Sequence, residues 1–270
     1  MFPGVRSAPP LTRARTRRSE MTEIPRAHPR HASLALRELL VEGHRQGMVV
    51  PQGLIAHGRG EMFYYLLGER TTKEARDAAK AAAALMLDAE RPVISVNGNV
   101  AALCPREVVE LARASGARLE VGLFHRSDRR VSLIADALKG SGAEEVLGFL
   151  PDARIPGLDG PRGLCSSEGI SEADLVVIPL EDGDRAEALA RMGKRTVAID
   201  LNPLSRTSRS ATVTVVDEVT KAVLEVHRQV EDLRDDPDAR RKALEAYDRD
   251  ENLARVMEVM ASNLGRLKDR

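Results

Sequence analysis

Three short loops of this chain carry carboxylate, amide and guanidinium groups directly after apolar stretches that are typical of strands. They are "NGN" (residues 97–99), "EDGDR" (181–185) and "DLNPLSR" (200–206). In an open parallel sheet, ligands bind beyond the carboxyl ends of the strands. Carboxylates in such a place hold ribose hydroxyls or Mg²⁺, and arginines and backbone N–H groups face phosphates. These loops therefore mark where a ligand would bind.

The "EDGDR" loop has a functional and a structural interpretation that are equally supported. In the first, Asp182 and Asp184 hold ribose hydroxyls or Mg²⁺ while Arg185 and backbone N–H groups face phosphates. In the second, the acids cap the following helix and complement its dipole. Spacing alone leaves both interpretations open.

The "DLNPLSR" loop is less specific. Asp200 ends an apolar stretch and is either a ribose ligand or a turn residue, with the two interpretations balanced. An Asx turn is the favoured interpretation of Asn202, because Pro203 follows it. Arg206 is either a phosphate ligand or a solvated surface group, and the second is commoner.

Two further loops carry polar groups at the ends of expected strands. A plain turn explains Asn97 and Asn99 around their glycine, although the two amides would also suit a substrate carboxylate or hydroxyls. In "FHRSDRR", His125 and Arg126 would suit an anionic substrate, but a solvated loop is the favoured interpretation. Both signals are weak on their own.

The "HGRG" segment (residues 57–60) places His57 and Arg59 between glycines. One interpretation is a tight turn into a helix. The other is a backbone-lined pocket with a fixed cation that faces a ligand's negative charge, in which Gly58 and Gly60 keep Cβ atoms away from Arg59. The six histidines show no HExxH or comparable spacing, which argues against a transition-metal site.

The elements that position these loops follow from hydrophobic periodicity. We expect a helix over 31–47, an extended segment over 48–56, a short helix over 61–67 and a helix opened by a capping box of Thr71 and Glu74. From residue 92 onward, helices alternate with strands expected at 92–99, 118–124, 144–150, 173–180, 195–201 and 211–217. This alternation predicts an α/β fold with a parallel, doubly wound sheet and helices on both faces.

Composition excludes several classes of protein. Aromatic residues make up 3% of the 270 residues and tryptophan is absent, which argues against base-stacking platforms for nucleic acid. The formal net charge is zero, so no acidic or nucleic-acid partner is indicated. The longest apolar stretch is too short to span a bilayer. Cys104 and Cys165 form no CxxC, and a reducing cytoplasm fits them.

The first 20 residues differ from the rest of the chain. They contain five arginines and one glutamate and show no apolar periodicity. We expect a disordered basic leader, and a nucleic-acid-binding arm is the less favoured alternative. The remaining segments are expected to be an N-terminal helical segment (21–91) that contributes to the ligand site, an α/β core (92–216) and C-terminal helices (217–270).

The standard nucleotide-binding and nucleophile signatures are absent. No GxGxxG follows an expected strand, and there is no GxxxxGK[ST]. A nucleotide would therefore bind through another arrangement. No Ser-His-Asp or Cys-His pattern for covalent catalysis is present either.

Five blocks of the sequence together resemble one enzyme family. They are "IPRAHPRHASLALRELLVEG", "GLIAHGRGEMFYYLLGERTT", "RPVISVNGNVAAL", "VVIPLEDGDRAEALARMGK" and "AIDLNPLSR". In this order, from about residue 23 to about residue 265, the chain resembles the archaeal phosphopantothenate synthetases, which are the 4-phosphopantoate–β-alanine ligases of coenzyme A biosynthesis. The resemblance implies a Rossmann-like core, a homodimer, and ATP-dependent joining of 4-phosphopantoate to β-alanine with release of AMP and pyrophosphate.

The resemblance also implies which residues contact ATP. Mg²⁺ is expected together with ATP, and its protein ligands are unknown. The family's ATP contacts fall here on Arg37, Arg59, Asp182, Gly183, Asp184, Ala188, Leu189, Asp200, Leu201 and Arg206. Arg59, Asn97 and His57 are the candidates for catalysis, and the role of His57 stays open. The phosphopantoate pocket is expected to use Asn97, Asn99, His125 and Arg126. A non-catalytic, nucleotide-binding regulatory protein is the alternative function.

Overall fold

The computed structural model describes residues 24–268, with side chains described as far as residue 266. The expected basic leader, residues 1–20, lies outside the described residues. The chain divides into two compact units, one ending at Glu38 and the other beginning at Leu39. Helix α1 spans His31–Arg45, and every later element belongs to the second unit.

A five-stranded, fully parallel sheet forms the centre of the second unit. Its order is β2 (Arg118–Val121), β1 (Pro92–Val96), β5 (Leu175–Pro179), β6 (Arg195–Ile199) and β7 (Val213–Val215). Every residue of β1 and β5 is buried. Strands covered on both faces are expected to be continuous apolar runs, and these are, apart from the buried Ser95 of β1. The predicted Rossmann-like α/β architecture is therefore confirmed.

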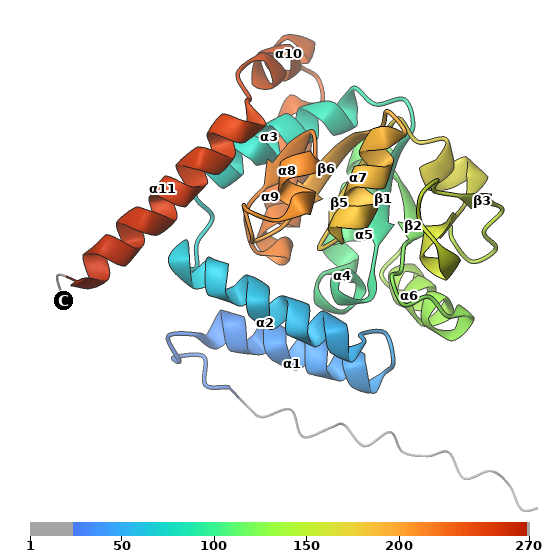
Figure 1. Cartoon of the computed structure of the whole chain (residues 1–270), viewed down its shortest axis with the longest axis horizontal. Coiled ribbons are helices and arrows are strands. Elements are labelled where there is room, and N and C mark those ends of the chain that lie inside the picture. Colours follow the sequence, from blue (N-terminus) through green and yellow to red (C-terminus); the bar gives the residue numbers. More distant parts are fainter. Residues whose placement is uncertain (1–23, 269–270) are drawn as a thin grey trace, which may run out of the picture. The chain divides into compact units, whose positions relative to one another are not determined.

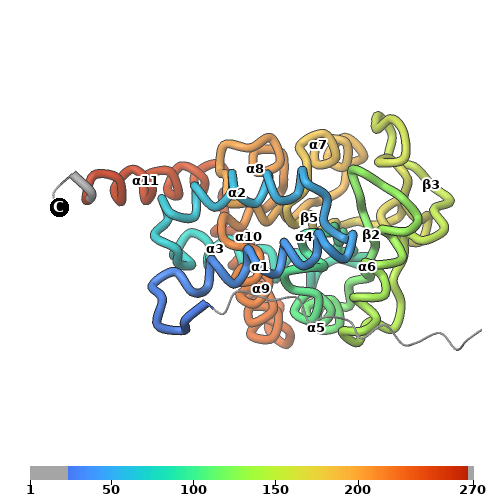
Figure 2. Tube along the Cα trace, turned by 90° about the horizontal axis from the view of Figure 1, so that it is seen from below, coloured from blue at the N-terminus to red at the C-terminus, as the bar shows by residue number. Residues whose placement is uncertain are grey.

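Helices cover both faces of this sheet (Figures 1 and 2). On one side pack α3 (Lys73–Leu87), α5 (Pro105–Ser115) and α9 (Val219–Leu233), and on the other α7 (Gly183–Arg191) and α8 (Arg206–Ser210). Helix α3 approaches closely because its buried face consists largely of alanines. Helix α5 has Pro105 at its start and Gly116 at its left-handed C-cap, which are the positions where these residue types are favoured.

The remaining elements surround this core. They are α2 (Pro51–Leu66), α4 (Gly98–Leu103), α6 (Asp128–Gly140), α10 (Pro237–Glu245), α11 (Arg249–Lys268), the small antiparallel pair β3 (Ala153–Arg154) and β4 (Leu164–Cys165), and the single turns η1 (Gly160–Gly163) and η2 (Ser167–Ser171). Helix α2 lies along the edge where the strands end (Figure 1).

One sequence-based expectation was wrong in a way that affects the site. Residues 51–56 are not extended and "HGRG" is not a turn, because α2 is one continuous helix from Pro51. Proline at the first helical position has a preset φ and no N–H that needs a partner. Three glycines weaken the intrinsic preference for a helix, and packing offsets this: α11 contacts α2, and Asn263 Nδ2 donates to Leu66 O at 2.8 Å.

Two smaller expectations were also wrong. Thr72, rather than Thr71, caps α3 by accepting from Ala75 N, while the Thr71 hydroxyl donates to Asp217 at 2.6 Å. Residues 144–150 form only a single parallel bridge between Leu147 and Glu120. The chain cannot continue as a strand there because Gly148 adopts a φ of 93°.

Candidate functional site

A cavity of about 650 Å³ opens between α2 and the carboxyl ends of the central strands. All three polar loops predicted from the sequence contribute to it, together with "HGRG". The sequence-predicted residues that line it are His57, Arg59, Asn97, Asn99, His125, Asp182, Gly183, Asp200, Leu201 and Arg206. Ten of the residues predicted from the sequence thus lie around one cavity.

The position of the cavity follows from the strand order. Among the five parallel strands the chain first adds β2 beside β1 and then adds β5 on the other side of β1. Loops that leave β1 and β5 therefore diverge, which produces a crevice at this topological switch point. Residues 97–99 and 180–183 stand on its two sides.

The Asn97 side chain forms hydrogen bonds with backbone groups on both sides of the crevice. Its Oδ1 accepts from the backbone N–H groups of Asn99 and Val100 at 3.0 and 3.1 Å and so caps α4. Its Nδ2 donates to the carbonyls of Pro179 and Leu180 at 2.9 and 3.2 Å. Because both ends of the carboxamide are engaged, Asn97 acts as a positioning residue. The expected turn is the start of a short helix.

The chain adopts an unusual conformation where β5 ends. Leu180 has a φ of 52°, in the left-handed region that costs a non-glycine residue roughly 1–2 kcal/mol. Its N–H donates to Ile199 O at 2.9 Å, and its carbonyl accepts from Asn97. These bonds hold the conformation, and the next residue, Glu181, lines the cavity. Such conformations persist where the surrounding structure enforces them.

The "EDGDR" loop combines the two interpretations that its sequence left open. Asp182 caps α7 by accepting from Arg185 N at 3.1 Å, and it also lines the cavity. Asp184 accepts from Arg206 at 2.8 Å and from Arg162 at 3.1 Å. The hydrogen bond from Arg206, followed by that from Arg162, lowers the pKa of the Asp184 carboxyl. The result is a helix N-terminus flanked by arginines, which favours anions.

The "DLNPLSR" loop contains the expected Asx turn. Asn202 Oδ1 accepts from Leu204 N at 2.9 Å, and Asp200 accepts from Asn202 N at 3.0 Å and from the Ser205 hydroxyl at 2.6 Å. Burial raises the pKa of Asp200, while these hydrogen bonds and the charge of Arg59 act in the opposite direction. The loop is therefore held rigidly by its own polar groups.

Helix α2 is docked onto the loop after β1. Asn99 Nδ2 donates to Gly53 O at 2.9 Å, and a Cβ at residue 53 would lie 2.3 Å from Asn99 Oδ1. Glycine is therefore required at residue 53, because the backbone of α2 approaches the Asn99 side chain too closely for a Cβ atom. At Gly58 a Cβ would meet nothing within 4 Å, and at Gly60 it would make ordinary contact with Leu201. The chain's own packing gives no support to the idea that Gly58 and Gly60 must keep Cβ atoms away from Arg59.

Several predicted residues are not brought to the cavity lining. Arg126 turns away and donates to Gly148 O. Ala188 and Leu189 lie inside α7, with their side chains in the hydrophobic core. Asp184 reaches the site only through Arg206, and Arg37 belongs to the first compact unit.

Sequence reasoning missed Arg130, which lines the cavity from α6. Its Nε and Nη2 donate to Met48 O at 3.1 and 2.8 Å, and its Nη1 donates to His125 O. Burial lowers the pKa of this guanidinium. The cation-rich string "HRSDRR" was a usable signal, but only the fold shows which arginine faces the cavity.

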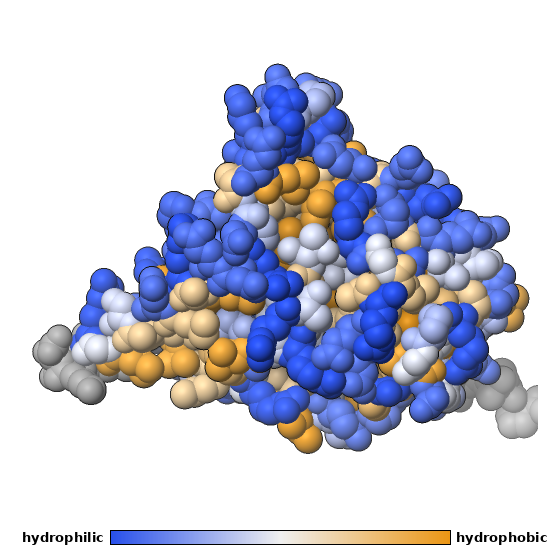
Figure 3. All heavy atoms as spheres, turned by 45° about the horizontal axis from the view of Figure 1, so that its top comes forward, coloured by the Kyte–Doolittle hydropathy of each residue, from blue (hydrophilic) through white to orange (hydrophobic). Residues whose placement is uncertain are grey.

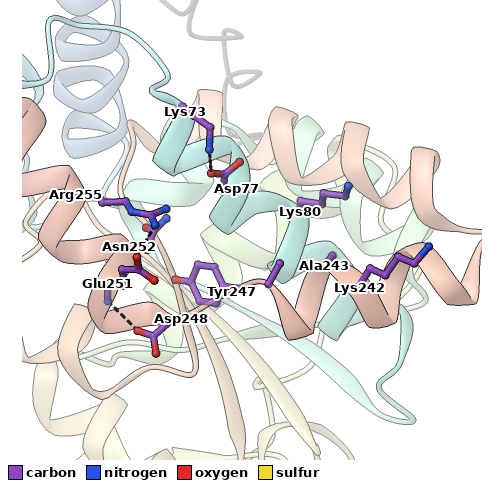
Figure 4. A pocket seen from close by; sticks show the side chains of 11 residues that line it. Lys73, Asp77, Lys80, Lys242, Ala243, Tyr247, Asp248, Glu251, Asn252 and Arg255 are labelled. Carbon is purple, nitrogen blue, oxygen red and sulfur yellow. Dashed lines mark hydrogen bonds and ion pairs between the residues drawn. The ribbon is translucent and has the colours of Figure 1, made fainter.

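A second, smaller cavity lies between α3, α10 and α11 (Figure 4). Its volume is about 360 Å³ and its lining mixes lysines with acids, including Lys73 paired with Asp77 at 2.5 Å. None of the sequence-predicted site residues lines it. Among the described residues, no helix has both the length and the apolarity that a membrane span requires.

Comparison with known proteins gives one consistent result. Residues 74–263 match the model of the family described as phosphopantothenate/pantothenate synthetase. The chain belongs to this family. The 4-phosphopantoate–β-alanine ligase of Methanosarcina mazei is 58% identical over 203 residues, covering 75% of this chain and 80% of the relative. That of Thermococcus kodakarensis is 50% identical over 254 residues, covering 92% and 96%.

The phosphopantothenate/pantothenate synthetase match includes the whole parallel sheet and both diverging loops of the crevice. Helix α2, which supplies His57 and Arg59 to the cavity, precedes the matched range. The Thermococcus relative nevertheless extends over nearly the full chain. The family assignment therefore agrees with the resemblance seen in the sequence.

Proposed function

We propose that this protein is an ATP-dependent ligase that joins 4-phosphopantoate to β-alanine, giving 4′-phosphopantothenate, AMP and pyrophosphate. The names of the relatives support the substrates. The single observation that supports this chemistry is the composition of the cavity lining. The N-terminus of α7 lies in this lining together with Arg59, Arg130 and Arg206. Cations at such a position favour the meeting of several anions.

The first proposed step activates the carboxylate of 4-phosphopantoate. One carboxylate oxygen attacks the α-phosphorus of ATP, the bond between the α-phosphorus and the bridging oxygen breaks, and pyrophosphate leaves. Arg59 and Arg206 would bind the phosphate oxygens, since guanidinium groups recognise them in a bidentate manner. Arg206 is already oriented by Asp184 at 2.8 Å. The product is an acyl-adenylate.

The second proposed step forms the amide. The amine nitrogen of β-alanine attacks the acyl carbon, the bond from that carbon to the phosphate oxygen breaks, and AMP leaves. No covalent bond to the protein is needed. Catalysis then rests on holding the two reactants in contact and on stabilising the developing negative charge.

Mg²⁺ would enter this site with ATP. Within the described part of the chain, no group of three or more His, Cys, Asp or Glu side chains could hold a metal ion. Magnesium bound to a nucleotide needs only one or two carboxylates, because phosphates and water supply its other ligands. Asp182, which faces the cavity, fits that requirement.

The finer assignments are also part of this proposal. ATP would contact the residues implied by the family resemblance, although four of them, Arg37, Asp184, Ala188 and Leu189, do not line the cavity. The phosphate of 4-phosphopantoate would bind near Asn99, His125 and Arg130, which are polar residues on the β1 side of the crevice. We further expect a homodimer, as the resemblance implies, and a cytoplasmic location.

Product analysis tests the proposal. Purified protein is incubated with ATP, β-alanine and either 4-phosphopantoate or pantoate, and nucleotides and amides are quantified. The proposal predicts one AMP per amide, with 4-phosphopantoate strongly preferred. Tight ATP binding without pyrophosphate release under any combination would instead support a regulatory nucleotide-binding protein.

A further inference from the structure

An exposed aromatic ring stands in the cationic cavity without an assigned role. Among the large apolar side chains of the described lining, Phe124 alone keeps as much as half of its surface accessible, at 50%. A single exposed apolar side chain on an open surface needs no explanation. In a cavity, however, apolar side chains usually contact the ligand. The position of Phe124 therefore points to an apolar part of a ligand.

Two contacts hold the Phe124 ring in place. The guanidinium carbon of Arg162 lies 5.0 Å from the ring centroid, and the His125 ring meets it edge-on with 4.9 Å between centroids. Arg162 is itself bound by Asp184 at 3.1 Å, and its carbonyl accepts from Arg185 Nη1 at 3.2 Å. The ring is therefore a prearranged contact surface.

The two aromatic residues of the lining belong to different sides of the cavity. Phe63, on α2, packs against the core cluster that contains Leu201, which follows β6. Phe124 follows β2 and adjoins His125, whose carbonyl accepts from Arg130 Nη1. Phe124 thus lies beside the residues proposed to bind the phosphate of 4-phosphopantoate.

The substrate carries an apolar group close to that phosphate. The third carbon of 4-phosphopantoate bears two methyl groups, and only one carbon and one oxygen separate it from the phosphorus. A phosphate bound near Asn99, His125 and Arg130 therefore brings the dimethyl carbon to the same end of the cavity. Removing methyl groups from water is favourable, so an apolar partner there strengthens binding.

We propose that the Phe124 ring packs against the dimethyl carbon of 4-phosphopantoate and so selects this substrate, an inference that rests on the proposed ligase function. The cations of the cavity bind a phosphate and a carboxylate whether or not methyl groups stand between them. The ring supplies the contact that distinguishes the methylated acid. Phe124 is thus a specificity-determining residue of the proposed reaction.

The test compares two acids in the full-length protein. Wild type and Phe124→Ala are assayed for amide and AMP formation with 4-phosphopantoate and with its analogue that lacks both methyl groups, 4-phosphorylated 2,4-dihydroxybutanoate. The KM for ATP is measured in parallel. A missing methylene in an apolar pocket typically costs about 10- to 200-fold in kcat/KM. Wild type should therefore favour 4-phosphopantoate over the analogue by at least about 10-fold.

The substitution should remove this preference selectively. We expect kcat/KM for 4-phosphopantoate to fall by about 10- to 100-fold in Phe124→Ala, and that for the analogue by less than about threefold. The KM for ATP should stay unchanged. If Phe124→Ala does not fold, as judged by circular dichroism, Phe124→Thr takes its place with the same expected result.

Phe149→Ala is the matched control. Phe149 is 52% exposed, almost as much as Phe124, but it does not line the cavity. This variant removes the same ring from the surface and should leave kcat/KM for both acids and the KM for ATP unchanged.

Three outcomes would overturn the proposal. One is an equal fall of kcat/KM for both acids in Phe124→Ala, which a merely structural role would produce. Another is wild-type activity of the variant with 4-phosphopantoate. The third is a raised KM for ATP with the preference between the acids intact, which would assign the ring to adenine. Failure of the proposed function itself is distinguishable, because wild-type protein would then form no amide from 4-phosphopantoate.

Discussion

Neighbouring carboxylates in the "EDGDR" loop have different environments although they lie within four residues of sequence. Glu181 is buried beside Arg185, and its pKa is raised by burial to about 7. Asp184 stands in solvent between two arginines, which lower its pKa. Environment rather than residue type thus raises the pKa of one carboxyl of this loop and lowers that of the other.

Asp184 is expected to act on ATP binding through Arg206. Replacing Asp184 by Asn removes the charged partner at 2.8 Å, so Arg206 loses its fixed orientation. Because this ion pair is solvent-exposed, the melting temperature should barely change. The KM for ATP should rise by about 3- to 10-fold with kcat nearly constant. A large fall in melting temperature with an unaltered KM would contradict this account.

At the scale of elements, α2 shows what the sequence revealed and what it concealed. Of the two interpretations of "HGRG", the cavity is compatible with the pocket, since His57 and Arg59 line it. Its helical conformation was missed because glycines at 53, 58 and 60 suppress helix propensity. The start at Pro51 was a usable signal, but the contacts with Asn99 and α11 that stabilise the helix are distant in sequence.

Two alanine substitutions in α2 should have opposite effects on stability. Gly53→Ala places a Cβ 2.3 Å from Asn99 Oδ1 and should lower the free energy of unfolding by about 1–3 kcal/mol. Gly58→Ala meets open space in a helix and should raise it by up to about 1 kcal/mol. Chemical denaturation of both variants measures this. Equal destabilisation would show that α2 is not docked as described.

At the scale of the whole second unit, the fold class was easier to predict from the sequence than the strand order or the loop residues that line the cavity. Alternating apolar strands such as 173–180 identified the parallel sheet, since burial on both faces leaves a continuous apolar run. Strand order was not predictable, because pairing between β1 and β5 joins distant segments. The sequence could not show that Arg130 rather than Arg126 lines the cavity, since both arginines follow the same strand.

The surface offers a test of the proposed homodimer. Figure 3 shows apolar surface along α11 among hydrophilic neighbours, and Ile55 and Met62 are 62% and 57% exposed on one stripe of α2. Contiguous apolar surface of this kind marks interaction sites. Met62→Asp should shift the protein toward a monomer in light scattering. Leu150→Asp, at a residue 82% exposed outside α2 and α11, is the control and should leave the mass unchanged.

The central claim is that a carboxylate attacks the α-phosphorus of ATP at the crevice between β1 and β5. It is tested most directly with 4-phosphopantoate whose carboxylate carries a heavy oxygen isotope. When the amide forms, one labelled oxygen should be found by mass spectrometry in the phosphate of AMP. Label in inorganic phosphate, accompanied by ADP, would show attack at the γ-phosphorus and would contradict the account.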